Sequence, residues 1–178
     1  LTSTNTEELE NLWRKASSLG PVEGNIFKGS PDLEPWKIRR MAQISRNYPI
    51  FSYLEVGVNA GHSLLNVLQN ARYIKRILLF DIVEHKYVEP KLEDIKAKCP
   101  NVDIKLIKGA STKTIPDTPA KYKFDLIHID GGHSLETAYS DIVNCKKFSH
   151  EKTIIVIGFN SSFLSRGLWW RKERCQNI

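Results

Sequence analysis

Between Phe51 and Ile157, short runs of apolar residues alternate with segments in which apolar residues recur every three or four positions. Unbroken apolar runs are typical of buried strands, and the longer period is typical of amphipathic helices. We therefore expect strands at about 51–57, 76–81, 103–108, 124–130 and 153–157, and helices at about 62–71, 89–99 and 134–147.

Two of these runs, Ile77–Phe80 and Thr153–Ile157, are almost continuously apolar. A strand of that kind is buried on both faces, and strands that alternate with helices form a mostly parallel sheet. The pattern therefore predicts an α/β fold in which a doubly wound, mostly parallel sheet is covered by helices on both faces.

Two helices and a loop are expected before the first strand. Thr4–Glu7 resembles a capping box, and Gly20–Pro21 stops the helix that follows it. The apolar face of this helix is formed by Leu9, Leu12, Trp13 and Ala16. Residues 21–35 are rich in Gly, Pro and Ser, which predicts a loop, and the second helix is expected at about 36–46.

Composition indicates one ordinary globular domain, because 41% of the 178 residues are hydrophobic and 26% are charged. Residues 1–50 are expected to form an N-terminal helical segment and loop in the same domain as residues 51–178. No apolar run approaches the roughly 20 residues that span a bilayer, so no membrane partner is expected. Since the first residue is Leu1 and not Met, we expect a fragment, a processed form or a partial reading frame.

The formal net charge is +6, but the cations are spread along the whole chain. A scattered excess is typical of a solvated surface, so nucleic acid is not an expected partner. The three cysteines, Cys99, Cys145 and Cys175, are far apart and form no CxxC pair. Such a set indicates reduced thiols and an intracellular, cytoplasmic protein.

The candidate chemistry follows the strands, because ligands of an open parallel sheet bind beyond the carboxyl ends of its strands. The first strand runs into "YLEVGVNAGHS", where Glu55 is followed by Gly57 and Gly61. Glycines let the backbone approach a ligand, and the start of the next helix favours an anionic group. The dinucleotide fingerprint would need Gly where Asn59 stands. The alternative interpretation is a tight turn between strand and helix.

The second strand ends at Asp81, about 20 positions after Gly61, which is where an acidic residue can bind the two hydroxyls of a ribose. The third strand ends before Ser111 and Thr112, whose hydroxyls can bond the edge of an adenine. Each of these features alone is equally compatible with ordinary turn chemistry.

The fourth strand, "FDLIHID", ends on Asp130, and "GGH" follows. We expect Asp130 to face a ligand, and His133 to transfer a proton or bind a metal near neutral pH. The alternative is a glycine-rich loop in which His133 helps to start the next helix. His128 lies inside the strand and is expected to be packed or hydrogen-bonded in the core.

Taken in order, "YLEVGVNAGHS", "FDIVEH", "IKGASTKTIP" and "FDLIHIDGGHS" resemble the successive motifs of class I S-adenosylmethionine-dependent methyltransferases. The likeness covers residues 53–157 and is greatest to catechol-type O-methyltransferases and to the branch with Asp-Gly-x-His after the fourth strand. It implies a Rossmann-like fold, S-adenosyl-L-methionine as cofactor, and O-methylation of a hydroxyl on a small-molecule acceptor.

The resemblance also implies a role for each matching residue. Asp130 would lie near the sulfonium of the cofactor, Asp81 would bind the ribose, and Ile82 would lie against the adenine. His133 falls where the catechol-type enzymes place the residue that takes the proton of the acceptor, so Asp130 and His133 are the expected catalytic residues. The remaining expected cofactor contacts are Glu55, Gly57, Asn59, Gly61, Ser63, Ser111 and Thr112.

The chain departs from this family at the fifth strand and after it. Metal-dependent relatives end that strand with a second acidic residue, whereas this chain has Gly158, Phe159 and Asn160. Asp130 would then be the single carboxylate of a Mg²⁺ site, a poor set for a cation that prefers several oxygen ligands. Too few residues follow Ser161 for the two further strands of the family, so we expect a truncated sheet. Trp169 and the neighbouring Trp170 are expected to pack over its edge, and the alternative is that they contact a partner.

Two other functions remain open from the sequence. One is a catalytically impaired or inactive protein that keeps the fold and serves as a cofactor-binding or interaction module. The other is an NAD-dependent oxidoreductase, which the missing middle glycine at Asn59 disfavours. Neither the acceptor nor the oligomeric state is indicated.

Overall fold

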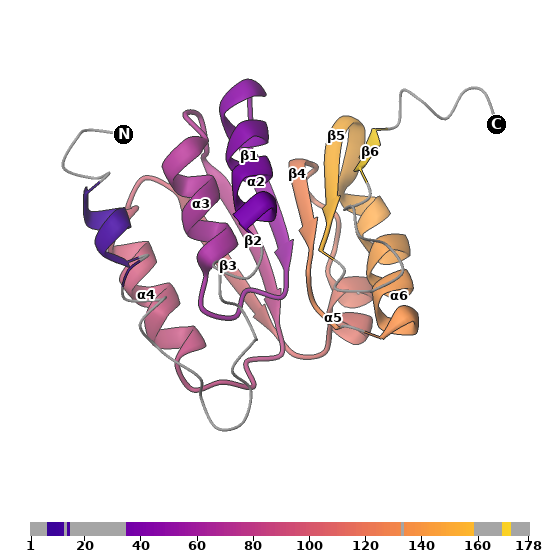
Figure 1. Ribbon diagram of the computed structural model, residues 1–178. Helices are drawn as coiled ribbons and strands as arrows, with labels where there is room; N and C mark the ends of the chain where they lie inside the picture. Colours follow the sequence, from indigo (N-terminus) through magenta and orange to yellow (C-terminus); the bar gives the residue numbers. More distant parts are fainter. Residues whose placement is uncertain (1–6, 13, 15–34, 133, 159–168, 172–178) are drawn as a thin grey trace.

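The computed structural model describes residues 7–12, 14, 35–132, 134–158 and 169–171 (Figure 1). Residues 7–12 and 14 are helical. The further helices are α2 (Pro35–Asn47), α3 (His62–Asn70), α4 (Val88–Lys98), α5 (Ser111–Asp117), α6 (Leu135–Cys145) and the 3-10 helix η2 (Lys146–Phe148). The strands are β1 (Ser52–Val56), β2 (Arg76–Asp81), β3 (Asp103–Lys108), β4 (Phe124–Ile129), β5 (Ser149–Ile157) and β6 (Trp169–Arg171).

The strands form one sheet in the order β3-β2-β1-β4-β5-β6. The pairs among β1 to β5 are all parallel, which confirms the predicted doubly wound sheet. Because the chain moves outward from β1 to β3 and then returns to the other side as β4, the strand order reverses between β1 and β4. Ligands of doubly wound sheets bind at the carboxyl end of such a reversal.

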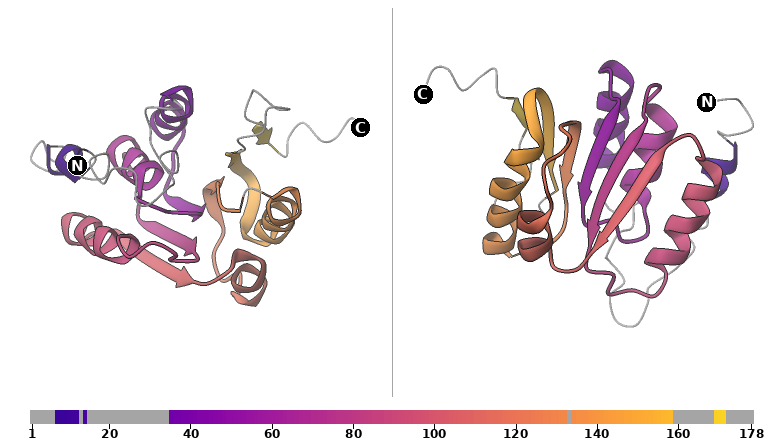
Figure 2. Two further views of the ribbon diagram at one scale, coloured as in Figure 1. Left: turned by 60° about the horizontal axis from the view of Figure 1, so that its bottom comes forward. Right: turned by 180° about the vertical axis from the view of Figure 1, so that it is seen from behind.

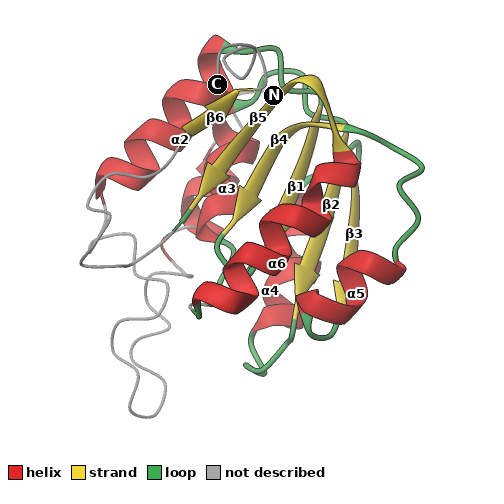
Figure 3. Cartoon of the chain, turned by 90° about the vertical axis from the view of Figure 1, so that its right-hand side faces the viewer, coloured by secondary structure: helices red, strands yellow, loops and turns green. Residues whose placement is uncertain are grey.

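Helices cover both faces of the sheet, as Figures 2 and 3 show. One apolar core joins the sheet to α2, α3 and α4, and it includes Met41, Leu65 and Leu92. The other core joins the opposite face to α5, α6 and η2, and it includes Ile115 and Phe148. Burial on both faces explains why the central strands are apolar almost without interruption.

Alternation along β1 and β4 decides which polar side chains meet. Tyr53 belongs to the core under α2 and α3, whereas Leu54 belongs to the opposite core. Successive strand residues point to opposite faces, so Glu55 shares the face of Tyr53. The same alternation in β4 puts His128 on that face, directly beside Glu55 in the pairing register.

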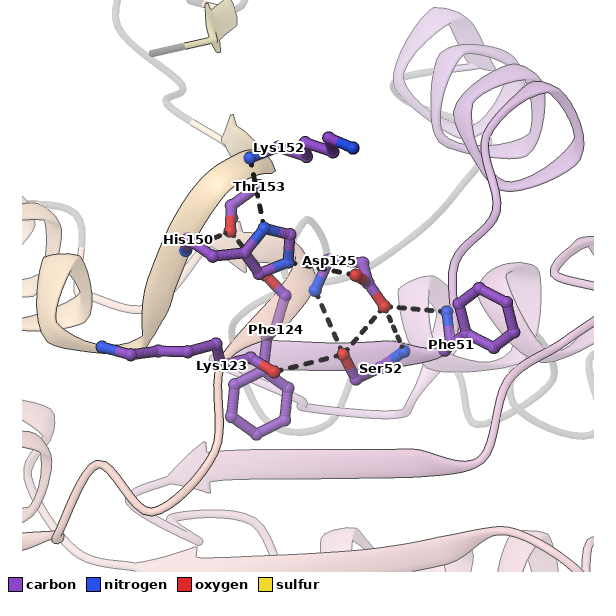
Figure 4. Close-up of polar contacts among 8 residues, drawn as sticks. All are labelled: Phe51, Ser52, Lys123, Phe124, Asp125, His150, Lys152 and Thr153. Atoms are coloured by element: carbon purple, nitrogen blue, oxygen red, sulfur yellow. Dashed lines mark hydrogen bonds and ion pairs between the residues drawn. The ribbon is translucent and has the colours of Figure 1, made fainter.

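A polar cluster joins the amino ends of β1, β4 and β5 (Figure 4). The Oδ2 atom of Asp125 accepts hydrogen bonds from the amide and hydroxyl of Ser52, each over 2.9 Å. His150 donates from Nε2 to Asp125 over 3.1 Å, while its Nδ1 accepts from the amide of Lys152. Both nitrogens of His150 thus have partners other than the Ser52 hydroxyl, so Ser52, Asp125 and His150 lack the order of a hydrolase triad and act as a structural clamp.

Only parts of the N-terminal and C-terminal segments are described, so the predictions for them can be checked only in part. Leu9 and Leu12 are buried as predicted, whereas Trp13, Ala16 and the loop predicted at 21–35, apart from Pro35, lie outside the described residues. Trp169–Arg171 adds the antiparallel strand β6 to β5, which the sequence did not predict. In the described part of the chain, the sheet thus has one short strand beyond the five parallel ones.

Helix α5 was not predicted: the hydroxyl residues at its start are equally compatible with a turn, and the helix is short and contains Pro116. Strand β5 begins at Ser149, four residues earlier than expected. Cys99 and Cys145 are buried free thiols, and burial raises the pKa of the Cys145 thiol to about 12. Among the described helices, none is both long and apolar enough to cross a bilayer.

Candidate functional site

The carboxyl ends of the five parallel strands line up along one edge of the sheet. We call it the carboxyl edge, and it consists of Gly57, Asp81, Gly109, Asp130 and Gly158. Backbone hydrogen bonds continue the ladder to these residues: the amide of Asp130 donates to Val56 and that of Gly158 to Ile129, each over 2.8 Å. The predicted candidates Asp81 and Asp130 are therefore placed on one rigid edge.

The loop after β1 turns sharply at two glycines with left-handed backbone angles. Gly57 has a φ of 86° and Gly61 a φ of 82°. At Gly57 a Cβ atom would lie only 2.3 Å from the carbonyl oxygen of Asp130, so β1 and β4 touch there through their backbones. At Gly61 the nearest atom is a flexible side-chain methyl of Ile95 at 3.1 Å. Both glycines are needed for the turn, but only Gly57 is needed for the close approach.

Asp81 binds this loop. Its Oδ2 atom accepts hydrogen bonds from the amides of Val58 over 2.7 Å and Asn59 over 3.0 Å. Its Oδ1 atom accepts from the amide of Val83 over 2.6 Å. Since a carboxylate has about four acceptor positions, these three amides from the described residues leave Asp81 able to take another donor.

Tyr87 is a residue of this site that the sequence analysis missed. Its hydroxyl donates to the side-chain oxygen of Asn59, and its ring stacks on His85 at a centroid distance of 5.1 Å. Burial and the nearby carboxylates of Asp81 and Glu84 raise the pKa of the Tyr87 hydroxyl, so it remains a neutral donor. The sequence contains only a weak signal for this role, because an aromatic residue at the start of a helix usually packs against the core.

Asp130 is held by a residue from a distant part of the chain. The ammonium of Lys37, on α2, lies 3.0 Å from Asp130 Oδ2, and the two side chains are 18% and 24% exposed. Gly158 makes room for this pair: a Cβ there would lie 2.4 Å from Asp130 Oδ1 and 2.7 Å from the Lys37 ammonium. The pairing of Lys37 with Asp130 has no signal in the sequence, because the two residues are 93 positions apart.

Behind Asp130 lies a buried polar network formed by Tyr53, Glu55 and His128. His128 Nδ1 is 3.2 Å from Glu55 Oε1 and 3.4 Å from the Tyr53 hydroxyl, while its Nε2 is 3.9 Å from Asp130 Oδ2. The expected burial of His128 is confirmed, since it is 1% exposed. The network connects the interior of the sheet to the carboxyl edge.

Glu55 is the acidic residue of this network, and burial disfavours its ionised form. Its side chain is 1% exposed, and no hydrogen-bond donor among the described residues meets its Oε2 atom. Burial raises the pKa of Glu55, and the hydrogen bond from His128 offsets this only in part. Glu55, expected among the cofactor contacts, therefore lies below the carboxyl edge and faces His128.

The third strand leads into α5, which packs against α6. Ser111 is half-buried and Thr112 is exposed at the start of α5, and Ile82 is 64% exposed next to Asp81. Asp141, on α6, is fully buried near Gly131, and burial raises the pKa of its carboxyl group. Ser63, at the start of α3, is half-buried, and His133 lies outside the described residues.

The described residues do not fit a Mg²⁺ site at Asp130. This cation takes oxygen ligands in an octahedral arrangement, whereas Asp130 meets an ammonium from Lys37 and an imidazole from His128. No group of three His, Cys, Asp or Glu in the described part of the chain can hold a metal ion. Asn160, whose side-chain oxygen is another possible ligand after the fifth strand, lies outside that part.

A family model described as a methyltransferase domain matches residues 54–158, which is more than half of the chain. The chain belongs to this methyltransferase-domain family. No curated protein matches it.

Solved methyltransferases share the fold at low identity. The SAH-bound methyltransferase PaMTH1 of Podospora anserina has a TM-score of 0.63 at 18% identity, over 85% of this chain and 61% of its own. The O-methyltransferase of Bacillus cereus in complex with SAH has a TM-score of 0.59 at 17% identity, over 88% and 66%. The SAM-bound O-methyltransferase TomG of Streptomyces achromogenes has a TM-score of 0.60 at 13% identity, over the same shares.

The chain thus spans less than two thirds of the length of these structures. The methyltransferase domain matches the region that carries Glu55, Asp81 and Asp130, whereas the N-terminal helices lie outside it.

The two glycines of the loop provide a matched test of the close approach. Both Gly57→Ala and Gly61→Ala force a side chain into a left-handed conformation, which alone costs about 1 kcal/mol or more. Only Gly57→Ala also drives a Cβ into the Asp130 carbonyl. We expect it to lower the free energy of unfolding by more than about 3 kcal/mol, and Gly61→Ala by clearly less. Urea unfolding of both variants measures this, and equal losses would contradict it.

Glu55 predicts a pH dependence of stability. Because its pKa in the folded state is raised above the value of 4.5 found for an exposed group, its contribution is fully present below about pH 4.5 and is lost as the pH rises through the folded pKa. We expect wild type to lose stability relative to Glu55→Gln between pH 4.5 and 7.5, by about 1.4 kcal/mol for each unit of raised pKa.

Urea unfolding of wild type and Glu55→Gln at several pH values tests this, with the exposed Glu151→Gln as control. A difference between wild type and Glu55→Gln that stays constant across the range would show that burial of the ionised carboxyl carries no cost.

Proposed function

We propose that this protein is an S-adenosyl-L-methionine-dependent methyltransferase that methylates a hydroxyl group of a small molecule. The family of the chain supports the class of reaction, and the O-methyltransferases among its structural neighbours suggest the acceptor atom. The main support for the proposal is the position of the Asp81 carboxylate and its hydrogen bonds. This carboxylate stands at the carboxyl edge, next to the strand reversal, and fastens the glycine loop while it still has acceptor capacity.

Each part of the cofactor has a matching group along the carboxyl edge. Asp81 would accept the hydrogens of the ribose hydroxyls, and the exposed Ile82 beside it would cover the adenine. Ser111 and Thr112 lie one strand further along, where the other edge of the adenine would reach. The glycine loop and the start of α3, with Asn59 and Ser63, would receive the methionine part of the cofactor. Glu55 acts indirectly in this proposal, through His128 and Asp130.

The cofactor supplies a methyl group on a sulfonium, and the transfer to an oxygen is an in-line displacement. The work of the protein is then to hold donor and acceptor in line and to remove the proton of the acceptor hydroxyl. We propose that Asp130 orients both groups from the end of β4 and that His133 takes the proton. Because the described residues do not fit Mg²⁺, no step in this proposal depends on it.

Asp81 has two roles, so the test must separate ribose binding from support of the loop. We expect Asp81→Ala to weaken binding of S-adenosylhomocysteine by about ten-fold or more, because a hydrogen bond to a charged group contributes about 1.5–3 kcal/mol. Removal of the ribose 2′-hydroxyl from the ligand should cost the wild type a similar factor. In Asp81→Ala the same change of ligand should cost almost nothing.

Calorimetry with both ligands and both proteins measures this coupling, and Asp117→Ala, on the exposed end of α5, is the control. Unchanged affinity in Asp81→Ala, or an equal loss from the 2′-deoxy ligand in both proteins, would contradict the proposed ribose contact. Titration with NAD in place of S-adenosylhomocysteine separates the oxidoreductase alternative, and cofactor binding without turnover of any hydroxyl acceptor would favour an inactive module.

A further inference from the structure

We propose that Lys37 is the built-in cation of this site, and that it neutralises Asp130 where a divalent cation would otherwise do so. This inference rests on the proposed function, since it concerns the charge beside the methyl donor. It assigns a positioning role to a residue of α2, which lies outside the matched methyltransferase domain.

The fold brings Lys37 to Asp130 by the alternation of side chains in β4. His128 and Asp130 are two residues apart, so they point to the same face of the sheet. That face is covered by α2 and α3, and the amide side chain of Asn66 on α3 donates to the backbone of Ile38 over 2.9 Å. The first turn of α2 is thereby fixed above the carboxyl edge, with the Lys37 ammonium 3.0 Å from Asp130 Oδ2.

Gly158 and Lys37 are sterically matched. A Cβ at position 158 would overlap both the Asp130 carboxyl group and the Lys37 ammonium, at distances of 2.4 and 2.7 Å. A side chain at that place, such as a second metal-binding carboxylate, would displace the ends of Lys37 and Asp130 from their paired position. The absence of a side chain at Gly158 therefore allows the Lys37 ammonium, and not a metal ion, to pair with Asp130.

The ion pair of Lys37 and Asp130 lies in a partly buried position, where its charges act strongly on a bound ligand. Both side chains are less than a quarter exposed, so water screens them less than it screens a surface ion pair. Among the described residues, His128 also lies close to this carboxylate, with its Nε2 atom 3.9 Å from Asp130 Oδ2. With Lys37 present, the lysine and the carboxylate together carry no net charge. Without it, a bare carboxylate would face the methyl donor.

This difference predicts a change of ligand preference. S-adenosylmethionine carries a positive sulfonium, and S-adenosylhomocysteine carries a neutral sulfur at the same place. A bare Asp130 should attract the first and not the second. We expect Lys37→Met to shift the ratio of the two affinities toward S-adenosylmethionine by about three-fold or more. Lys37→Arg keeps the charge and should keep the wild-type ratio.

Calorimetry with both nucleosides tests this in wild type, Lys37→Met, Lys37→Arg and the control Lys105→Met, which changes an exposed lysine of the edge strand β3. Each is measured with EDTA and with 5 mM Mg²⁺, and thermal unfolding identifies the folded variants. We expect Mg²⁺ to leave the wild-type ratio unchanged.

Three outcomes overturn the inference: an unchanged ratio in Lys37→Met, an equal shift in Lys37→Arg, or a shift of the wild-type ratio by Mg²⁺. A purely structural role of Lys37 would weaken both ligands by the same factor, and so would leave the ratio unchanged. If the wild type binds neither nucleoside, the proposed function itself fails, which is distinguishable from a failure of the role of Lys37.

Discussion

The backbones of β1 and β4 come into contact at their carboxyl ends, and the rest of the site depends on this approach. Position 57 has no space for a Cβ because the carbonyl of Asp130 lies there. Since β1 and β4 are the two strands on either side of the reversal, their contact fixes the separation between the glycine loop and Asp130. Asp81 then fastens the loop from the neighbouring strand through the amides of Val58 and Asn59. Three strand ends are thus held as one rigid unit.

Electrostatics adds a second constraint behind this edge. Glu55 and His128 are buried on the same face of the sheet as Asp130, and burial alone disfavours the ionised form of a carboxyl group. The structure offsets the cost in two ways: His128 bonds Glu55 inside the sheet, and Lys37 pairs with Asp130 at its edge. Buried polar groups that are only partly satisfied are costly, so their presence here is consistent with a functional site rather than with packing alone.

The sequence predicted most of the framework, because each parallel strand is a short apolar run and each main helix has a clear period. The positions of Asp81 and Asp130 at strand ends followed from the same pattern. Helix α5 was missed since it is short and contains Pro116, and β6 was missed since three residues carry no periodic signal. The pairing of Lys37 with Asp130 was invisible, because it joins residues 93 positions apart through the packing of α2. Likewise, the burial of Glu55 depends on packing between elements that are distant in the sequence, including its neighbour His128 on β4.

The central claim is that the carboxyl edge binds a nucleoside-bearing methyl donor, and a crystal structure of the chain with S-adenosylhomocysteine tests it most directly. We expect the ribose hydroxyls within hydrogen-bond distance of Asp81, the adenine against Ile82, and the sulfur beside Asp130. A ligand bound at another part of the molecule, or one whose ribose does not contact Asp81, would show that the carboxyl edge is not the cofactor site.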